Sequence, residues 1–115
     1  MPNNLKKINQ KYDKLKRIRS YSSENKSVLI IGGGYMGKEY ARALQKLGII
    51  DVTIITKSKK QSSDFSEKFD FTVLDGGFEK HLPTIEKKDL VIISTPTELL
   101  IPATKLSIET GQTKI

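Results

Sequence analysis

Short continuous runs of apolar, mostly β-branched residues recur along the chain after residue 26. They cover residues 28–31, 52–56, 71–74 and 90–94. A run without polar alternation predicts a strand that is covered on both faces. We therefore expect a sheet whose strands are buried on both sides.

The segments between these runs have helical periodicity. Apolar residues share one face of a helix over residues 35–47, and Gly48 follows as a C-terminal cap. We predict a short helix over 63–69, and a last helix that has Pro102 in its first turn and ends at Gly111. Strands that alternate with helices predict an α/β fold with a parallel sheet.

Residues 1–26 differ from the rest of the chain. Apolar residues at a spacing of three or four, separated by Lys and Arg, predict a helix that leads into a polar linker. This extension carries eight basic and two acidic side chains, whereas residues 27–115 are close to neutral. The extension therefore carries +6 of the net charge of +7. Nucleic acid or an anionic membrane is not the favoured partner, because such helices commonly pack on their own domain.

Composition excludes several classes of site. The chain has 115 residues, enough for one domain, and it has no cysteine, which excludes a disulfide framework, a thiolate zinc site and a cysteine nucleophile. Its single histidine, His81, has no serine or acid grouped with it in a catalytic pattern, and we expect no metal site. Lysines interrupt the N-terminus where a signal peptide would be apolar, so we expect a cytoplasmic protein.

A glycine motif follows the first predicted strand. Gly32, Gly34 and Gly37 fit the pattern G-x-G-x-x-G. In that pattern the first glycine allows a tight turn, the second lets a pyrophosphate approach the backbone, and the third lets helix and strand pack closely. We predict a Rossmann-like sheet of order 3-2-1-4-5 with helices on both faces, and a dinucleotide at the helix N-terminus. A domain that binds another nucleotide, or none, is the alternative.

The residues after the second strand bear on the choice of cofactor. NAD-binding domains usually have an acid here that accepts hydrogen bonds from the ribose. This chain has Thr56, Lys57 and Ser58, followed by Lys59 and Lys60. Hydroxyl and ammonium groups suit a 2′-phosphate, which favours NADP over NAD. The alternative is a solvated lysine loop.

Ser94, Thr95 and Pro96 follow the fourth strand. Ligands of open parallel sheets lie beyond the carboxyl ends of the strands, near the point where the strand order reverses. We therefore expect these residues to line the nicotinamide side of the cofactor. An ordinary strand-to-helix turn is the alternative.

Together, residues 28–37, residues 89–96 and the final helix ending in Gly111 resemble the N-terminal domain of the Gfo/Idh/MocA family of NAD(P)-dependent oxidoreductases. The resemblance covers about residues 27–115. It implies a pyrophosphate at Gly32, Gly34, Tyr35, Met36 and Gly37, the adenosine ribose or its phosphate at Thr56 and Lys57, and the rest of the cofactor at Ser94, Thr95 and Pro96.

The sequence departs from that family at two places. Leu100 stands where the family often has a histidine, and the family's Glu-Lys-Pro motif and substrate domain would follow residue 115. We therefore expect the NADP(H)-binding half of an oxidoreductase that acts on a sugar-like or cyclitol hydroxyl or carbonyl, inactive by itself. A non-catalytic NAD(P)- or nucleotide-sensing module is the alternative, and homo-oligomerisation is left open.

Overall fold

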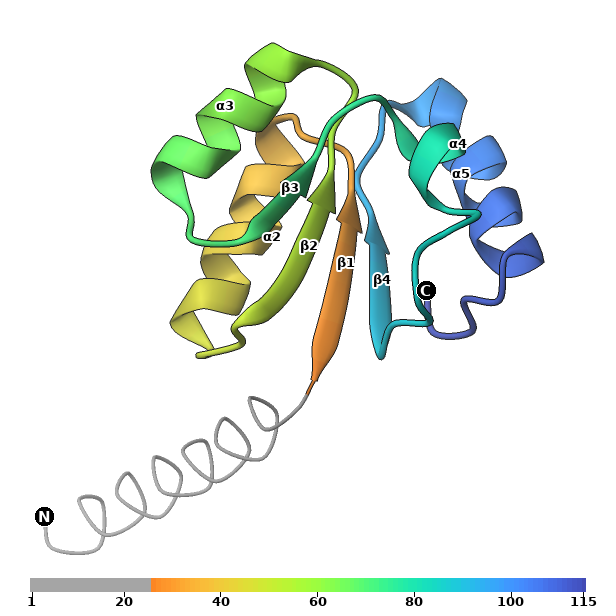
Figure 1. Ribbon diagram of the computed structural model, residues 1–115, viewed down its shortest axis with the longest axis horizontal. Coiled ribbons are helices and arrows are strands. Elements are labelled where there is room, and N and C mark those ends of the chain that lie inside the picture. The colour runs from red at the N-terminus through yellow and green to blue at the C-terminus, as the bar shows by residue number, and fades with distance from the viewer. Residues whose placement is uncertain (1–25) are drawn as a thin grey trace, which may run out of the picture.

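The structure, a computed structural model, describes residues 26–115 (Figure 1). The predicted basic helix and linker lie outside the described residues, apart from Lys26. The described elements, in chain order, are β1 (Ser27–Ile31), α2 (Tyr35–Lys46), β2 (Asp51–Ile55), α3 (Lys59–Lys68), β3 (Thr72–Leu74), α4 (Phe78–His81), β4 (Leu90–Ile93) and α5 (Thr97–Glu109).

The four strands form one parallel sheet of order β3-β2-β1-β4. This confirms the predicted α/β class and the order of the first four strands. The predicted fifth strand is absent from the described residues, since residues 112–115 are not assigned to a strand. The N–H of Val91 does donate to the carbonyl of Lys114 at 2.7 Å. The end of the chain therefore runs along the free edge of β4, where a fifth strand would pair.

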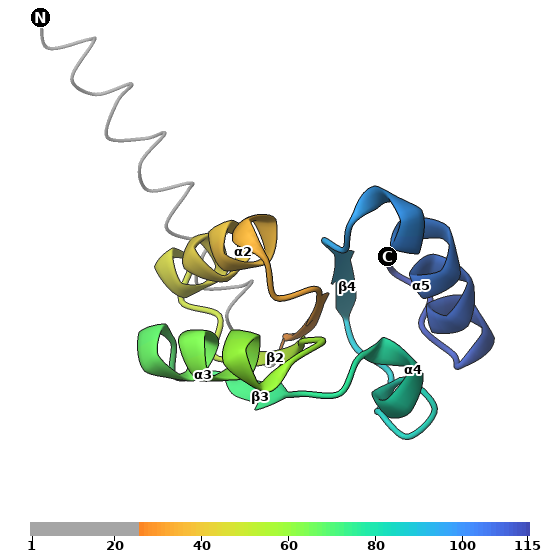
Figure 2. The ribbon, with the colours of Figure 1, turned by 90° about the horizontal axis from the view of Figure 1, so that it is seen from above.

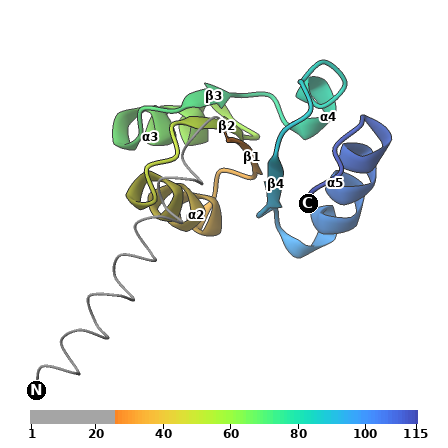
Figure 3. The same ribbon diagram turned by 90° about the horizontal axis from the view of Figure 1, so that it is seen from below.

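Helices cover both faces of the sheet, as the continuous apolar runs predict. Figures 2 and 3 show α2 and α3 on one side and α4 and α5 on the other. Each face of the sheet has its own hydrophobic core, and alternate residues of β1 belong to different cores. Val28 and Ile30 pack toward α2 and α3, whereas Leu29 and Ile31 pack toward α4 and α5. Among residues 26–115, no helix has the length and apolarity needed to cross a membrane.

The end of α2 confirms the predicted glycine cap. Gly48 has φ +80°, and its N–H donates to the carbonyl of Gln45 at 3.1 Å. The N–H of Ile49 donates to the carbonyl of Leu44, also at 3.1 Å, which completes a Schellman motif. Leu44 and Ile49 are both buried in the same core. The cap therefore directs the chain into β2.

Two helices begin earlier than the sequence analysis predicts, and a third was missed. α3 begins at Lys59 because the Ser58 hydroxyl accepts a hydrogen bond from the Gln61 N–H, so polar side chains form its first turn. α5 begins directly after Pro96, and Pro102 lies inside the helix, so the prediction of a first-turn proline was wrong. The short helix α4 has too few residues to show a period.

The amino ends of β1 and β4 are joined by a polar contact. The Asp89 carboxylate accepts hydrogen bonds from the Ser27 N–H at 2.8 Å and from the Ser27 hydroxyl at 3.2 Å. These bonds favour the charged form and lower the pKa of Asp89 below its ordinary value. The contact fixes the central strand pair at the edge of the sheet opposite to the glycine loop.

A pH-dependent stability follows from this contact. A carboxyl group whose pKa is lower in the folded state stabilises the fold above its unfolded pKa of about 4, and this contribution is lost as the pH falls through the folded value. We expect Asp89→Asn to be less stable than the wild type at pH 7, with the difference shrinking toward pH 3, in urea unfolding curves. Asp70→Asn is the matched control, because Asp70 is exposed and has no hydrogen bond or ion pair within residues 26–115. Equal pH profiles for the two variants would contradict the assignment.

Candidate functional site

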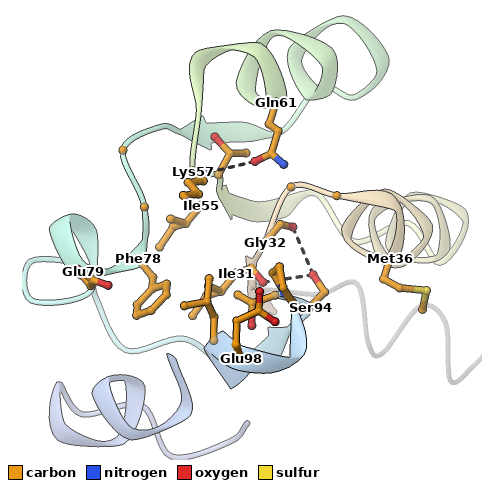
Figure 4. Close-up of a pocket in the computed structure, with 18 of the residues that line it drawn as sticks. Ile31, Gly32, Met36, Ile55, Lys57, Gln61, Phe78, Glu79, Ser94 and Glu98 are labelled. Carbon is orange, nitrogen blue, oxygen red and sulfur yellow. Dashed lines mark hydrogen bonds between the residues drawn. The ribbon is translucent and has the colours of Figure 1, made fainter. Parts of the chain in front are cut away.

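A cavity of about 610 Å³ opens at the carboxyl ends of β1, β2 and β4 (Figure 4). It lies where the loops after these strands meet, with α2 and α3 on one side and α4 and α5 on the other. Its walls combine backbone of the glycine loop, apolar side chains and a few polar groups. The lining residues are Ile31, Gly32, Gly33, Gly34, Tyr35, Met36, Ile55, Thr56, Lys57, Gln61, Gly76, Gly77, Phe78, Glu79, Ser94, Thr95, Pro96, Glu98 and Leu99.

Hydrogen bonds that extend the sheet hold the loops around the cavity. The N–H of Gly32 donates to the carbonyl of Ile55 at 2.9 Å, and the N–H of Ser94 donates to the carbonyl of Ile31 at 2.8 Å. The Ser94 hydroxyl donates to the carbonyls of Ile31 and Gly32 at 3.2 and 3.3 Å. The Ser94 side chain therefore ties the end of β4 to the glycine loop.

Two motif glycines are required because the backbone packs too closely for a side chain. A Cβ at Gly32, where φ is +117°, would lie 2.6 Å from the carbonyl oxygen of Ser94. A Cβ at Gly37 would lie 2.1 Å from the carbonyl oxygen of Gly32. Both contacts are with backbone atoms that cannot rotate away. Gly37 therefore brings α2 close to β1, as the motif predicts, but it does not line the cavity.

The second motif glycine, Gly34, has open space around it. A Cβ there would meet nothing within 4 Å, and its φ of −83° suits any residue. Gly34 is the N-cap of α2, no side chain caps this helix end, and the first turn contains no acid. The first N–H groups of a helix have no partner within the helix, and the helix dipole makes this end positive. The start of α2 is therefore suited to bind an anion in the cavity.

Thr56 and Lys57 both line the cavity at the end of β2, but the hydroxyl of Thr56 is already engaged in hydrogen bonds. Thr56 is 1% exposed, and its hydroxyl lies 2.5 Å from the Ser62 hydroxyl and 3.2 Å from the Ser58 carbonyl oxygen. Ser58 does not line the cavity and instead caps α3. Lys57 does line it, and its backbone N–H donates to the Gln61 side chain at 3.2 Å. The contacts predicted for Thr56 and Ser58 stay predictions, while the Lys57 side chain has no ion pair within residues 26–115.

On the β4 side, one buried side-chain polar atom lacks a hydrogen-bond partner within residues 26–115. The hydroxyl oxygen of Thr95 is buried and makes no hydrogen bond. A buried hydroxyl without a partner costs about 1–3 kcal/mol, so it needs a physical explanation. Thr95 lines the cavity and is followed by Pro96, the N-cap of α5. A bound molecule that accepts or donates a hydrogen bond here would satisfy the group.

Most of the predicted site residues come together at this cavity, and the structure adds others. The sequence analysis missed Ile31, Gly33, Ile55, Gln61, Gly76, Gly77, Phe78, Glu79, Glu98 and Leu99. Two signals were present. Ser58 and Gln61 have the spacing of a capping box, which marks a helix start, and Gly76-Gly77 ends β3 as a turn. Glu79 and Glu98 have no such signal, because only folding brings α4 and α5 to the glycine loop.

The residues present fit a dinucleotide. The open N-terminus of α2 suits a pyrophosphate, Lys57 offers a cation beside it, and the Thr95 hydroxyl needs a partner. Apolar walls from Ile31 and Phe78 suit the flat rings of a nucleotide. The cavity therefore offers an anion site beside an apolar wall.

Comparison with known proteins gives the family. The family model described as shikimate / quinate 5-dehydrogenase matches residues 13–114. The glutamyl-tRNA reductase of Listeria innocua is 31% identical over 77 residues, which are 67% of this chain and 17% of the reductase. The shikimate dehydrogenase (NADP⁺) of Methanothermobacter thermautotrophicus is 30% identical over 79 residues, 65% of this chain and 28% of the dehydrogenase. The shikimate dehydrogenase (NADP⁺) of Maridesulfovibrio salexigens is 31% identical over 80 residues, which are 68% of this chain and 27% of the dehydrogenase.

These matches support only part of the family prediction made from the sequence motifs. The NAD(P)-binding domain implied by the resemblance is supported, but the matching model is not that of the Gfo/Idh/MocA family. No solved structure matches the chain. The chain spans only 17% to 28% of the length of these curated relatives. Since the family model covers residues 13–114, the chain belongs to the shikimate / quinate 5-dehydrogenase family.

Proposed function

We propose that this chain is the NADP(H)-binding part of an oxidoreductase and that the cavity beside the glycine loop holds the cofactor. The observation that carries the proposal is the uncapped start of α2, which faces the cavity at a glycine that leaves room for a ligand. The names of the two shikimate dehydrogenase relatives state NADP⁺ as their cofactor, which supports NADP rather than NAD as the proposed cofactor of this chain.

Each part of the cavity has a role in this proposal. The N–H groups of Tyr35 and Met36 at the start of α2 bind the pyrophosphate, and Lys57 binds the adenosine 2′-phosphate. The Thr95 hydroxyl and Pro96 orient the nicotinamide side, and the apolar wall at Ile31 excludes water from it. The bound cofactor would supply the hydride, while these residues position it against a substrate.

The substrate is proposed as a ring alcohol or the corresponding ketone. The family description names shikimate and quinate, both hydroxylated rings, and this agrees only loosely with the sugar-like or cyclitol hydroxyl expected from the sequence. The cavity lies at the edge of the sheet, where a second domain would bring the substrate to the cofactor. We propose that substrate-binding groups come from such a domain. A nucleotide-sensing module would bind the same cofactor without this second surface.

Gly34 gives the sharpest test, because stability and binding should change in opposite directions. Gly34→Asp has room for its side chain, and aspartate is a favoured N-cap that stabilises a helix relative to glycine by about a few tenths of a kcal/mol. Its carboxylate would occupy and repel the proposed pyrophosphate site. We expect an unchanged or higher melting temperature and a loss of NADP⁺ affinity of about 100-fold or more in titration calorimetry of the full chain.

Gly34→Asn is the matched control, because asparagine caps a helix equally well without a negative charge. It should lose less affinity than Gly34→Asp. An aspartate variant that binds NADP⁺ as the wild type does would overturn the placement of the pyrophosphate. A wild-type chain that binds neither NADP⁺ nor NAD⁺ would overturn the proposed function.

Lys57 should set the preference for NADP⁺ over NAD⁺. A charge-assisted hydrogen bond to a phosphate contributes about 1.5–3 kcal/mol, and exposure of Lys57 places its effect at the lower end. Lys57→Ala should weaken NADP⁺ binding about 10-fold, leave NAD⁺ binding nearly unchanged, and reduce the salt dependence of the preference. Lys68→Ala, in the last turn of α3 away from the cavity, is the control. Equal losses for both nucleotides would mean that Lys57 does not contact the 2′-phosphate.

The Thr95 hydroxyl should strengthen NADP⁺ binding and lower the stability of the free chain. Thr95→Val keeps the shape and removes a buried hydroxyl that has no partner, so the free chain should be as stable as the wild type or more stable by up to about 1 kcal/mol. NADP⁺ affinity should fall about 5-fold, which corresponds to one neutral hydrogen bond. Thr104→Val is the control, since that hydroxyl already donates to the Leu100 carbonyl at 2.7 Å. A destabilised Thr95 variant with unchanged affinity would make the hydroxyl structural.

A further inference from the structure

A carboxylate stands in the part of the cavity assigned to the nicotinamide. Glu98 lies in the first turn of α5, two residues after Pro96, and lines the same cavity as the glycine loop. Figure 4 shows its side chain extending from α5 into the cavity region that Ile31 and Ser94 also line. Within residues 26–115, Glu98 makes no ion pair and no hydrogen bond through its side chain. Its charge is therefore not neutralised by the described part of the chain.

A negative charge in a cavity built for a phosphate-rich ligand is unfavourable unless it faces a part of the ligand that is neutral or positive. The anion-binding start of α2 and Lys57 lie on the β1 and β2 side, whereas Glu98 lies on the β4 side. In a doubly wound sheet the dinucleotide extends across the ends of these strands, so its two halves meet different groups. Glu98 therefore faces the half that carries the nicotinamide.

The charge of that ring differs between the two forms of the cofactor. The oxidised nicotinamide ring carries one positive charge, and the reduced ring is neutral. A nearby carboxylate attracts the first and has no net attraction for the second, and burial of the ring against apolar walls strengthens the attraction. Because the rest of the molecule is the same in both forms, a difference in affinity reports on groups close to the ring.

We propose that Glu98 makes this site discriminate between oxidation states, so that it binds NADP⁺ more tightly than NADPH. The proposal rests on the proposed function, since it requires the dinucleotide to lie in this cavity. Glu98 is exposed, so we expect a modest effect, about 3- to 10-fold in the ratio of the two dissociation constants. A tenfold ratio lowers the potential of the bound two-electron couple by about 30 mV. When NADPH reduces a substrate, the NADP⁺ that is formed is thereby stabilised on the protein.

The test is to titrate the full chain with NADP⁺ and with NADPH and to compare the wild type with three variants. Glu98→Gln should weaken NADP⁺ binding about 3- to 10-fold and leave NADPH binding unchanged or tighter. Glu98→Asp keeps the charge and should retain most of the preference, which separates the charge from a role in packing. Glu79→Gln removes a carboxylate that enters the cavity from α4, and it should change the two affinities by the same factor.

Binding of adenosine 2′,5′-bisphosphate, which lacks the nicotinamide half, should not change in Glu98→Gln. A shared loss for all three ligands would mean that the substitution disturbs the start of α5, and this would overturn the proposal. Equal ratios in wild type and Glu98→Gln, with both cofactors bound, would also overturn it and leave the proposed function standing. Failure of both cofactors to bind any of the proteins would overturn the proposed function itself.

Discussion

The structure depends on one close approach of backbone, where the turn after β1 passes between the start of α2 and the end of β4. Gly37 packs on the carbonyl of Gly32, and Gly32 packs on the carbonyl of Ser94, so that a side chain at either glycine would overlap backbone atoms. Because hydrogen bonds to the carbonyls of Ile55 and Ile31 hold Gly32 and Ser94 in place, no small adjustment relieves such an overlap. The contact sets how near α2 comes to the sheet, and with it the position of the open helix end.

This arrangement leaves polar groups without partners at the mouth of the cavity, which costs stability. The start of α2 has no capping side chain, and the Thr95 hydroxyl is buried without a hydrogen bond. Two apolar cores, one on each face of the sheet, offset that cost. The Ser94 hydroxyl and the strand-extending hydrogen bonds keep the loops in place. Unsatisfied groups at a site held this rigidly indicate preorganisation for a ligand.

Local sequence patterns were enough to predict the strands and the α2 helix with its glycine cap. They also predicted why the motif requires glycines. A continuous apolar run indicates a covered strand, and a glycine at the end of a periodic segment indicates a cap, whatever lies elsewhere in the chain. The starts of α3 and α5 were placed too late, because polar first turns carry no apolar period and Pro102 was taken as a start signal. The prediction of a fifth strand failed because a strand needs several successive backbone hydrogen bonds to its neighbour, which residues 112–115 do not make.

Sequence patterns were enough to predict the α/β class, the order of the four strands and the glycine loop at the carboxyl edge, since these follow from period, handedness and the small size of glycine. Which polar side chains are free to face the cavity depends on how the chain folds. Thr56 stands where a cofactor contact is expected, yet its hydroxyl is bound to Ser62, whereas Thr95 is left without a partner. Glu98 enters the cavity because α5 packs beside β4. Whether a hydroxyl or carboxylate is free to bind depends on neighbours far away in the sequence, and local patterns do not contain that information.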